Sequence, residues 1–133
     1  QFKKLKKLLK IKRKIFLEYK KNLSVIKSIQ FNQDNAVVKN GCWATVLVLN
    51  DINISTLKKI FKELSNLGYF ARPFFYPISK LPACKTISEK KKVKYTGNIN
   101  SNYLNKNGIV LPSSYILKKR DIRAICDTIK KFY

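Results

Sequence analysis

Apolar side chains recur every three or four residues through the first part of the chain, and lysine fills most positions between them. This spacing predicts an amphipathic helix over residues 2–22. Its basic face could meet phosphates or a membrane surface, but we favour the solvated side of a helix that packs on a core. No capping residue precedes Gln1, so we expect the helix to begin upstream and to leave Phe2 and Leu5 poorly covered. The stripe comprises Phe2, Leu5, Leu9, Phe16, Tyr19 and Leu23, with Lys12 at its one polar position.

Two strands and a helix are predicted in the middle of the chain. An Asn-Gly turn at residues 40–41 precedes the apolar run 42–49, which indicates a strand buried on both faces. A helix follows, with Ser55 as its expected N-cap and Gly68 as the glycine that ends it. Residues 69–75 then predict a second strand. The apolar face of the helix consists of Leu57, Ile60, Phe61, Leu64 and Leu67.

The last third of the chain predicts two helices around a short strand. Residues 86–97 are polar and rich in lysine, which indicates a mobile loop. Residues 98–107 predict a helix closed by Gly108, and residues 109–111 a short strand. Residues 121–132 predict a final amphipathic helix. Its apolar face comprises Ile122, Ile125, Cys126 and Ile129.

This alternation of helices and strands predicts an α+β fold, a small two-layer domain with a short, mainly antiparallel sheet packed with helices. Its 133 residues fit one domain over 1–133. Residues 1–24 form the leading helix, which we expect to continue from a domain outside this sequence. No apolar run is long enough for a transmembrane helix, and no cleavage site for a signal peptide follows the basic N-terminus.

The segment 71–85 carries three prolines, three aromatic residues and one of the four arginines. Proline fixes φ and pushes the preceding residue to an extended conformation, so we expect a stiff, extended loop. Such a loop suits recognition of a flat or anionic ligand, but from composition alone we favour a proline-bounded strand whose aromatic side chains are core. We expect Phe74 and Phe75 to face opposite sides, with Tyr76 and Ser79 more exposed than Phe74.

A net charge of +22 invites a nucleic-acid partner. The basic residues are almost all lysine, however, whereas proteins that recognise nucleic acids use arginine more often for contacts with bases and phosphates. Abundant lysine, asparagine and isoleucine also indicate a coding bias toward A and T. We therefore do not expect specific nucleic-acid binding, and we keep a free-standing lysine-rich nucleic-acid-binding module as the alternative function. Such a module should expose aromatic residues among its lysines, whereas here most aromatics fall on apolar stripes.

Nothing in the sequence forms a complete catalytic centre. The chain has no histidine, no P-loop and no dinucleotide-binding glycine motif. Cysteines at 42, 84 and 126 form no CxxC pair, so we expect no metal site. Their odd, sparse number indicates buried thiols in a reducing compartment.

Four ordered stretches resemble the C-terminal small domain of the DegT/StrS type of PLP-dependent sugar-nucleotide aminotransferases, especially perosamine synthase and related 4-aminotransferases. Residues 12–19 resemble the family's basic helix with its Arg and Tyr, and residues 43–48 resemble the strand that follows. Residues 71–85 resemble the family's Arg-Pro-aromatic loop, and residues 108–114 its Leu-Pro-Ser segment. Two positions depart from the family pattern: Ser79 stands where histidine is usual, and Cys84 where an aromatic residue is common.

The resemblance implies the C-terminal domain of a fold-type I PLP transferase, whose PLP lysine lies upstream of Gln1. We expect no catalytic or PLP-binding residue in this chain and no transaminase activity from the chain alone. The whole enzyme would be a cytoplasmic homodimer without a membrane partner. It would transfer an amino group from a donor such as glutamate to a keto-sugar nucleotide, in perosamine-type polysaccharide biosynthesis. The substrate-binding residues that we expect are Arg72, Phe75, Tyr76, Ser79 and Lys80.

Overall fold

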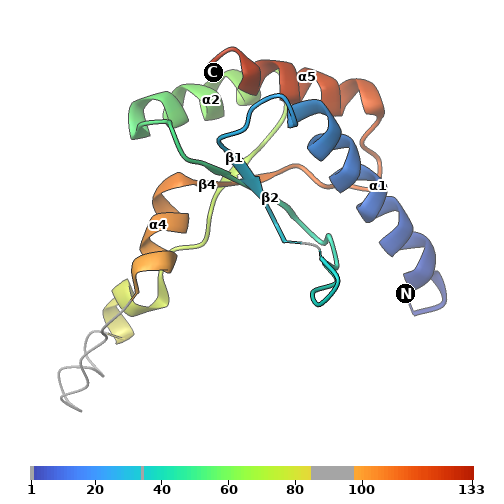
Figure 1. The fold of residues 1–133 in the computed structure, drawn as a ribbon, viewed down its shortest axis with the longest axis horizontal. Helices are drawn as coiled ribbons and strands as arrows, with labels where there is room; N and C mark the ends of the chain where they lie inside the picture. Colours follow the sequence, from blue (N-terminus) through green and yellow to red (C-terminus); the bar gives the residue numbers. More distant parts are fainter. Residues whose placement is uncertain (1, 34, 85–97) are drawn as a thin grey trace.

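Three helices cover one face of a small antiparallel sheet in the computed structural model (Figure 1), which describes residues 2–33, 35–84 and 98–133. Helices α1, α2 and α5 form this layer, and α4 lies at one end of the sheet. The predicted two-layer α+β fold is confirmed. In chain order the elements are η1 Phe2–Lys4, α1 Leu5–Leu23, β1 Ile29–Phe31, β2 Thr45–Leu49, α2 Ile54–Asn66, β3 Arg72–Pro73, η2 Ile78–Lys80, α4 Ile99–Asn107, β4 Gly108–Leu111 and α5 Lys119–Lys130.

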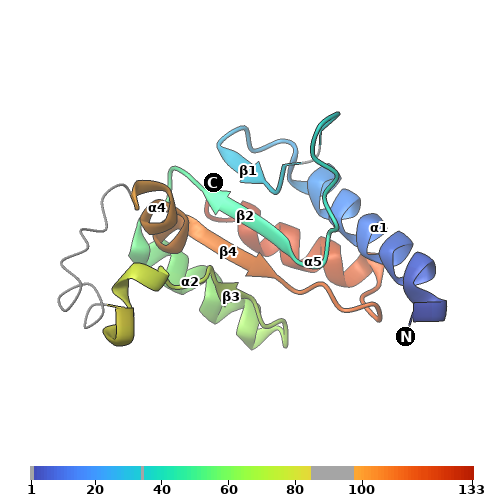
Figure 2. The same cartoon turned by 90° about the horizontal axis from the view of Figure 1, so that it is seen from below.

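The sheet has the order β1-β2-β4-β3, and every neighbouring pair of strands is antiparallel (Figure 2). Successive side chains of a strand point to opposite faces. Leu47 pairs with Ile109 and belongs with it to the buried core, so this register faces the helices. The next register joins Val46, Val110 and Arg72, which therefore lie on the opposite face, called here the outer face.

Helix α1 is anchored to the domain from Ile11 onward, whereas its first turns are uncovered. Tyr19 is fully buried and donates a hydrogen bond of 2.9 Å from its hydroxyl to the carbonyl oxygen of Pro112. At the other end, Phe2 is 90% exposed and Leu5 43%, which confirms that both are poorly covered. No side chain caps the helix at Lys4. The first turns of α1 therefore project beyond the domain as a two-sided amphipathic segment.

The N-cap of helix α2 lies two residues earlier than the sequence indicated. Asn53 is the N-cap, because its side-chain oxygen accepts a 2.9 Å hydrogen bond from the backbone N–H of Thr56. The prediction of Ser55 is wrong: its hydroxyl donates to Asn53 instead, at 2.7 Å. At the other end Gly68 has a φ of 79°, the left-handed conformation that favours glycine, so the predicted terminator is confirmed.

The two strands that flank α2 are shorter than predicted. The run 42–49 forms a strand only from Thr45, because Cys42 has a φ of 51° and turns the chain before it. Of the predicted strand 69–75, only Arg72 and Pro73 pair with β4, followed by one further bond from the N–H of Phe74 to the carbonyl of Gly108 at 3.0 Å. The predicted loop at 86–97 lies outside the described residues.

Gly108 closes α4 as predicted, but for a different reason. Its backbone is extended, with φ of −91° and ψ of 139°, and it opens β4 at once. A Cβ at this position would meet the carbonyl oxygen of Leu104 and would lie 2.8 Å from the Cβ of Phe74. The glycine is therefore required by close packing rather than by a left-handed turn.

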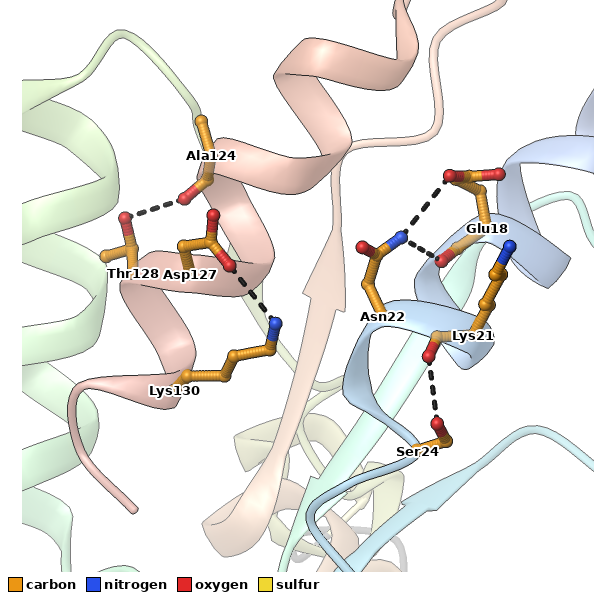
Figure 3. Close-up of polar contacts among 8 residues, drawn as sticks. All are labelled: Glu18, Lys21, Asn22, Ser24, Ala124, Asp127, Thr128 and Lys130. Carbon is orange, nitrogen blue, oxygen red and sulfur yellow. Dashed lines mark hydrogen bonds and ion pairs between the residues drawn. The ribbon is translucent and has the colours of Figure 1, made fainter.

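Some polar side chains of α1 and α5 form hydrogen bonds within their own helices (Figure 3). The buried hydroxyl of Thr128 donates to the carbonyl of Ala124 at 2.9 Å, one turn earlier. On α1, the amide of Asn22 donates to the carbonyl of Glu18 at 2.7 Å. In the part of the chain that the structure describes, no helix combines the length and apolar character needed to cross a membrane.

Candidate functional site

A hollow of about 500 Å³ opens between the loop after β3 and the first turns of α4. It brings together three of the residues expected to bind substrate, Phe75, Tyr76 and Ser79. The other two, Arg72 and Lys80, do not line it. The lining consists of Phe74, Phe75, Tyr76, Pro77, Ile78, Ser79, Asn98, Asn100, Ser101 and Leu104.

The loop is held in place by α4. The side-chain amide of Asn105 donates to the carbonyls of Phe74 and Phe75, at 3.1 and 3.2 Å. Pro77 is buried and still extended, with φ of −60° and ψ of 125°. The chain then tightens into η2, where the N–H of Lys80 donates to the carbonyl of Pro77 at 2.9 Å. The prediction of an extended loop is thus right to Pro77 and wrong beyond it.

The aromatic side chains of the loop divide into an inner one and two outer ones. Phe74 is half-buried over Gly108, whereas Phe75 is 62% exposed and Tyr76 57% exposed. The expectation that Tyr76 is more exposed than Phe74 is confirmed. Ser79 is half-buried like Phe74, so the expected contrast between these two residues is not seen. The rings of Phe74 and Phe75 meet edge to face, with centroids 5.5 Å apart.

Trp43 joins this loop from a distant part of the sequence, and sequence reasoning missed it. Its ring stacks on that of Phe75 with centroids 6.4 Å apart and an interplanar angle of 26°, and it is 69% exposed. The Nζ of Lys12 donates to the carbonyl of Trp43 at 3.1 Å and also to the carbonyl of Ser113. Lys12 thereby ties α1 to the segments before β2 and after β4. The available signal was a lone tryptophan placed directly before an apolar strand.

Among the described residues that line the hollow there is neither a lysine nor a carboxylate. The described lining offers aromatic rings, hydroxyl groups and side-chain amides, which suit contacts with a ligand. The clearest pKa shifts arise elsewhere, since burial raises the pKa of the Cys126 thiol to about 12 and also raises the pKa of Tyr19. Among the described residues, no cluster of acidic or cysteine side chains could hold a metal ion.

The described aromatic residues divide between the core and the surface, so the expectation that most lie on apolar stripes is met only in part. Phe16 and Tyr19 are fully buried, and four more are partly buried against the core: Phe31, Phe61, Tyr69 and Phe132. Burial of the stripe of α1 stops short of its first turns, and loop aromatics such as Phe75 project outward. The exposed set consists of Phe2, Trp43, Phe70, Phe75, Tyr76, Tyr103, Tyr115 and Tyr133.

Comparison with known proteins finds aminotransferases in each case. The sequence profile of the DegT/DnrJ/EryC1/StrS aminotransferase family matches residues 1–130. GDP-perosamine synthase of Vibrio cholerae is 28% identical over 133 residues, which is 100% of this chain and 35% of that protein.

Two solved structures share the fold. The candidate sugar aminotransferase Spr1654 of Streptococcus pneumoniae, in its PMP form, superposes with a TM-score of 0.81 at 18% identity, over 99% of this chain and 32% of that one. Helicobacter pylori PseC, an aminotransferase involved in pseudoaminic acid biosynthesis, gives a TM-score of 0.76 at 16% identity, over 100% of this chain and 34% of that one. The chain thus spans about a third of the length of the proteins that it matches.

Proposed function

Since the chain belongs to the DegT/DnrJ/EryC1/StrS aminotransferase family, we propose that it is the substrate-side small domain of a PLP-dependent enzyme that aminates a keto-sugar nucleotide. The observation that carries the proposal is the hollow beside α4, where Phe75, Tyr76 and Ser79 meet without any catalytic group. The perosamine synthase relative, which aligns over the whole chain, favours a 4-amino sugar as the product.

The chemistry belongs to a second domain in this proposal. PLP would act as the electron sink for amino transfer from a donor such as glutamate. Spr1654 occurs in PMP and PLP forms, and no lysine is among the described residues that line the hollow. Residues 1–133 then form one small domain, which joins a PLP-binding domain through α1 in a homodimeric enzyme. The free thiols of Cys42, Cys84 and Cys126 fit the cytoplasm that we propose as its compartment.

In this proposal the loop residues contact different parts of a sugar nucleotide. Phe75 and Tyr76 offer exposed ring faces to the apolar side of a sugar, and Ser79 offers a hydroxyl to its polar edge. Arg72 on the outer face and Lys80 in η2 are both exposed and are assigned to the diphosphate. Because Asn105 already fixes the loop, little ordering entropy would be lost on binding.

Steady-state kinetics of the intact enzyme test these roles. Arg72→Ala should raise the apparent KM for the sugar nucleotide about tenfold or more, because a charge-assisted hydrogen bond contributes about 1.5–3 kcal/mol. Tyr76→Ala should raise it about 2- to 10-fold, because an aromatic ring contact contributes about 0.5–1.5 kcal/mol. The KM for the amino donor should stay unchanged. Arg120→Ala and Tyr115→Ala are matched controls, since both residues are exposed and neither lines the hollow. Unchanged sugar-nucleotide kinetics in both loop variants would reduce the loop to a structural element.

The 133-residue chain provides a second test. We expect neither transaminase activity nor a stoichiometric complex with PLP, because the proposal places the PLP lysine in a second domain and no lysine is among the described residues that line the hollow. Absorbance titration with PLP should show only weak reaction spread over surface lysines. A single specific PLP site with an absorbance shift would contradict the proposed division of labour.

A nucleic-acid-binding module remains the second candidate, favoured by the net charge of +22 and by the exposed aromatic residues. Lysine-driven phosphate contacts predict weak binding that falls steeply with salt and does not depend on base sequence. An electrophoretic mobility assay at rising salt measures this. Tight binding to one sequence at physiological salt would favour the module over the aminotransferase.

A further inference from the structure

The rings of Trp43 and Phe75, called here the aromatic pair, stack on each other and leave an aromatic surface that no other part of the described domain covers. The two residues lie 32 positions apart, yet their rings are nearly parallel, at 26°. Both are more than 60% exposed, so the stacking leaves most of each ring in contact with water. Large aromatic side chains normally contribute to a fold by being buried, so an exposed stack suits a ligand better than it suits stability.

The backbone around the pair fixes its position. Phe75 is held through its carbonyl by Asn105, and the Trp43 carbonyl accepts a hydrogen bond from Lys12. Phe74 supports Phe75 edge to face from the inner side. The pair is therefore a preorganised surface: its rings come from the segment before β2 and the loop after β3, and side chains of α1 and α4 hold the two backbones in place.

The surroundings favour a flat ligand that carries negative charge. Lys12 places its ammonium next to the Trp43 backbone, and Arg72 lies exposed on the outer face three residues before Phe75. On its other side Phe75 lines the hollow, whose wall includes the polar residues Ser79 and Ser101. A single extended molecule with a flat ring, a phosphate group and a polar sugar would meet all three environments.

We propose that the aromatic pair is the nucleobase subsite for the sugar nucleotide, and that the base stacks on Trp43 and Phe75 while the hollow receives the sugar end. The inference rests on the proposed function for its ligand class, a nucleoside diphosphate. Trp43 then becomes a binding residue in addition to those expected from the sequence.

The only tryptophan of the chain belongs to the pair, so its fluorescence reports on the subsite directly. UDP and GDP, titrated into the 133-residue chain, should quench Trp43 emission in a saturable way. Inorganic pyrophosphate, which carries the charge without a base, should not. A free tryptophan derivative at the same concentrations corrects for absorption by the nucleotide.

Phe75→Leu removes one ring and should weaken nucleotide binding about 5- to 100-fold, since base–aromatic stacking contributes about 1–3 kcal/mol and 1.4 kcal/mol is tenfold. Phe70→Leu is the matched control, because Phe70 is 72% exposed and lies outside the pair and the hollow. Trp43→Leu should weaken binding similarly by equilibrium dialysis, and Trp43→Phe should restore much of it because a ring remains.

Three results would overturn the inference. One is the absence of saturable quenching. Another is equal competition by pyrophosphate with no effect of Phe75→Leu, which would show binding by charge alone. The third is a single-stranded oligonucleotide that binds far more tightly than UDP or GDP, which would assign the pair to nucleic acid. Failure of the proposed function would be detected by a different measurement. If the intact enzyme lacks aminotransferase activity, the proposed function fails, whereas the nucleotide titration still tests the aromatic pair.

Discussion

Gly108→Ala should damage both the fold and the candidate site, because the new methyl group has no room. Its Cβ would lie 2.8 Å from the Cβ of Phe74 and 3.1 Å from the Cγ of the same ring. Carbon atoms in good contact are about 3.5–4.0 Å apart, so the segments that carry Gly108 and Phe74 must separate by most of an ångström. The nearest atom is the carbonyl oxygen of Leu104, which accepts the N–H of Gly108 itself and cannot move away freely.

Overpacking of this kind costs about 1–3 kcal/mol of unfolding free energy. For a domain of this size 1 kcal/mol lowers the melting temperature by about 4 °C, so Gly108→Ala should melt about 4–12 °C lower. Urea unfolding followed by fluorescence gives the free energy independently. Because Phe74 supports Phe75 and Phe75 stacks on Trp43, the native emission of Trp43 should change as well.

Two other glycines provide the controls. Nothing lies within 4 Å of a Cβ built at Gly41, so Gly41→Ala should stay within about 0.5 kcal/mol of the parent. A Cβ at Gly68 also meets nothing, but its φ of 79° is strained for alanine, so Gly68→Ala should cost about 1–2 kcal/mol without altering Trp43 emission. If Gly108→Ala is as stable as Gly41→Ala, the close packing of Phe74 on the sheet is not a constraint and the reasoning fails.

Three further predictions concern the core and the helix caps. Tyr19→Phe removes the hydrogen bond to the carbonyl after β4 and should cost about 0.5–1.5 kcal/mol in urea unfolding; no measurable loss would mean that the hydroxyl contributes nothing. The pKa of Asp121 is lowered below its ordinary 3.8, chiefly because the N–H of Lys118 donates to its carboxylate, so its contribution to stability is present above about pH 4 and is lost as pH falls through the folded-state pKa. Asp121→Asn should therefore destabilise the chain at pH 7, and the difference should shrink as the pH falls below about 4; a pH-independent difference would contradict this. Burial should protect Cys126 from thiol reagents until the chain unfolds, whereas the partly exposed Cys84 should react in the folded chain, and rapid labelling of Cys126 would show that the core opens.

Elements with a strong apolar period were predictable from the sequence. The stripes of α1 and α5 carry enough evenly spaced Leu, Ile and Phe to specify a helix and its buried face without tertiary information. Predictions failed where one hydrogen bond or one φ angle decides the outcome. Asn53 rather than Ser55 caps α2, and Cys42 adopts a positive φ that no local propensity indicates.

The candidate site was only partly predictable for a related reason. Phe75, Tyr76 and Ser79 could be found because they share one proline-bounded segment. Trp43 and Asn105 reach the same place from other elements, through a ring contact and two side-chain hydrogen bonds. Contacts between segments so far apart in the chain depend on the completed sheet, and nothing in the local sequence encodes them.

The ammonium of Lys12 has a mechanical consequence. Its two hydrogen bonds join α1 to the backbone on both sides of the central strands, at Trp43 before β2 and at Ser113 after β4. The uncovered first turns of the helix lie only a few residues before Lys12. These two hydrogen bonds therefore help to fix the direction in which the uncovered turns leave the domain relative to Trp43.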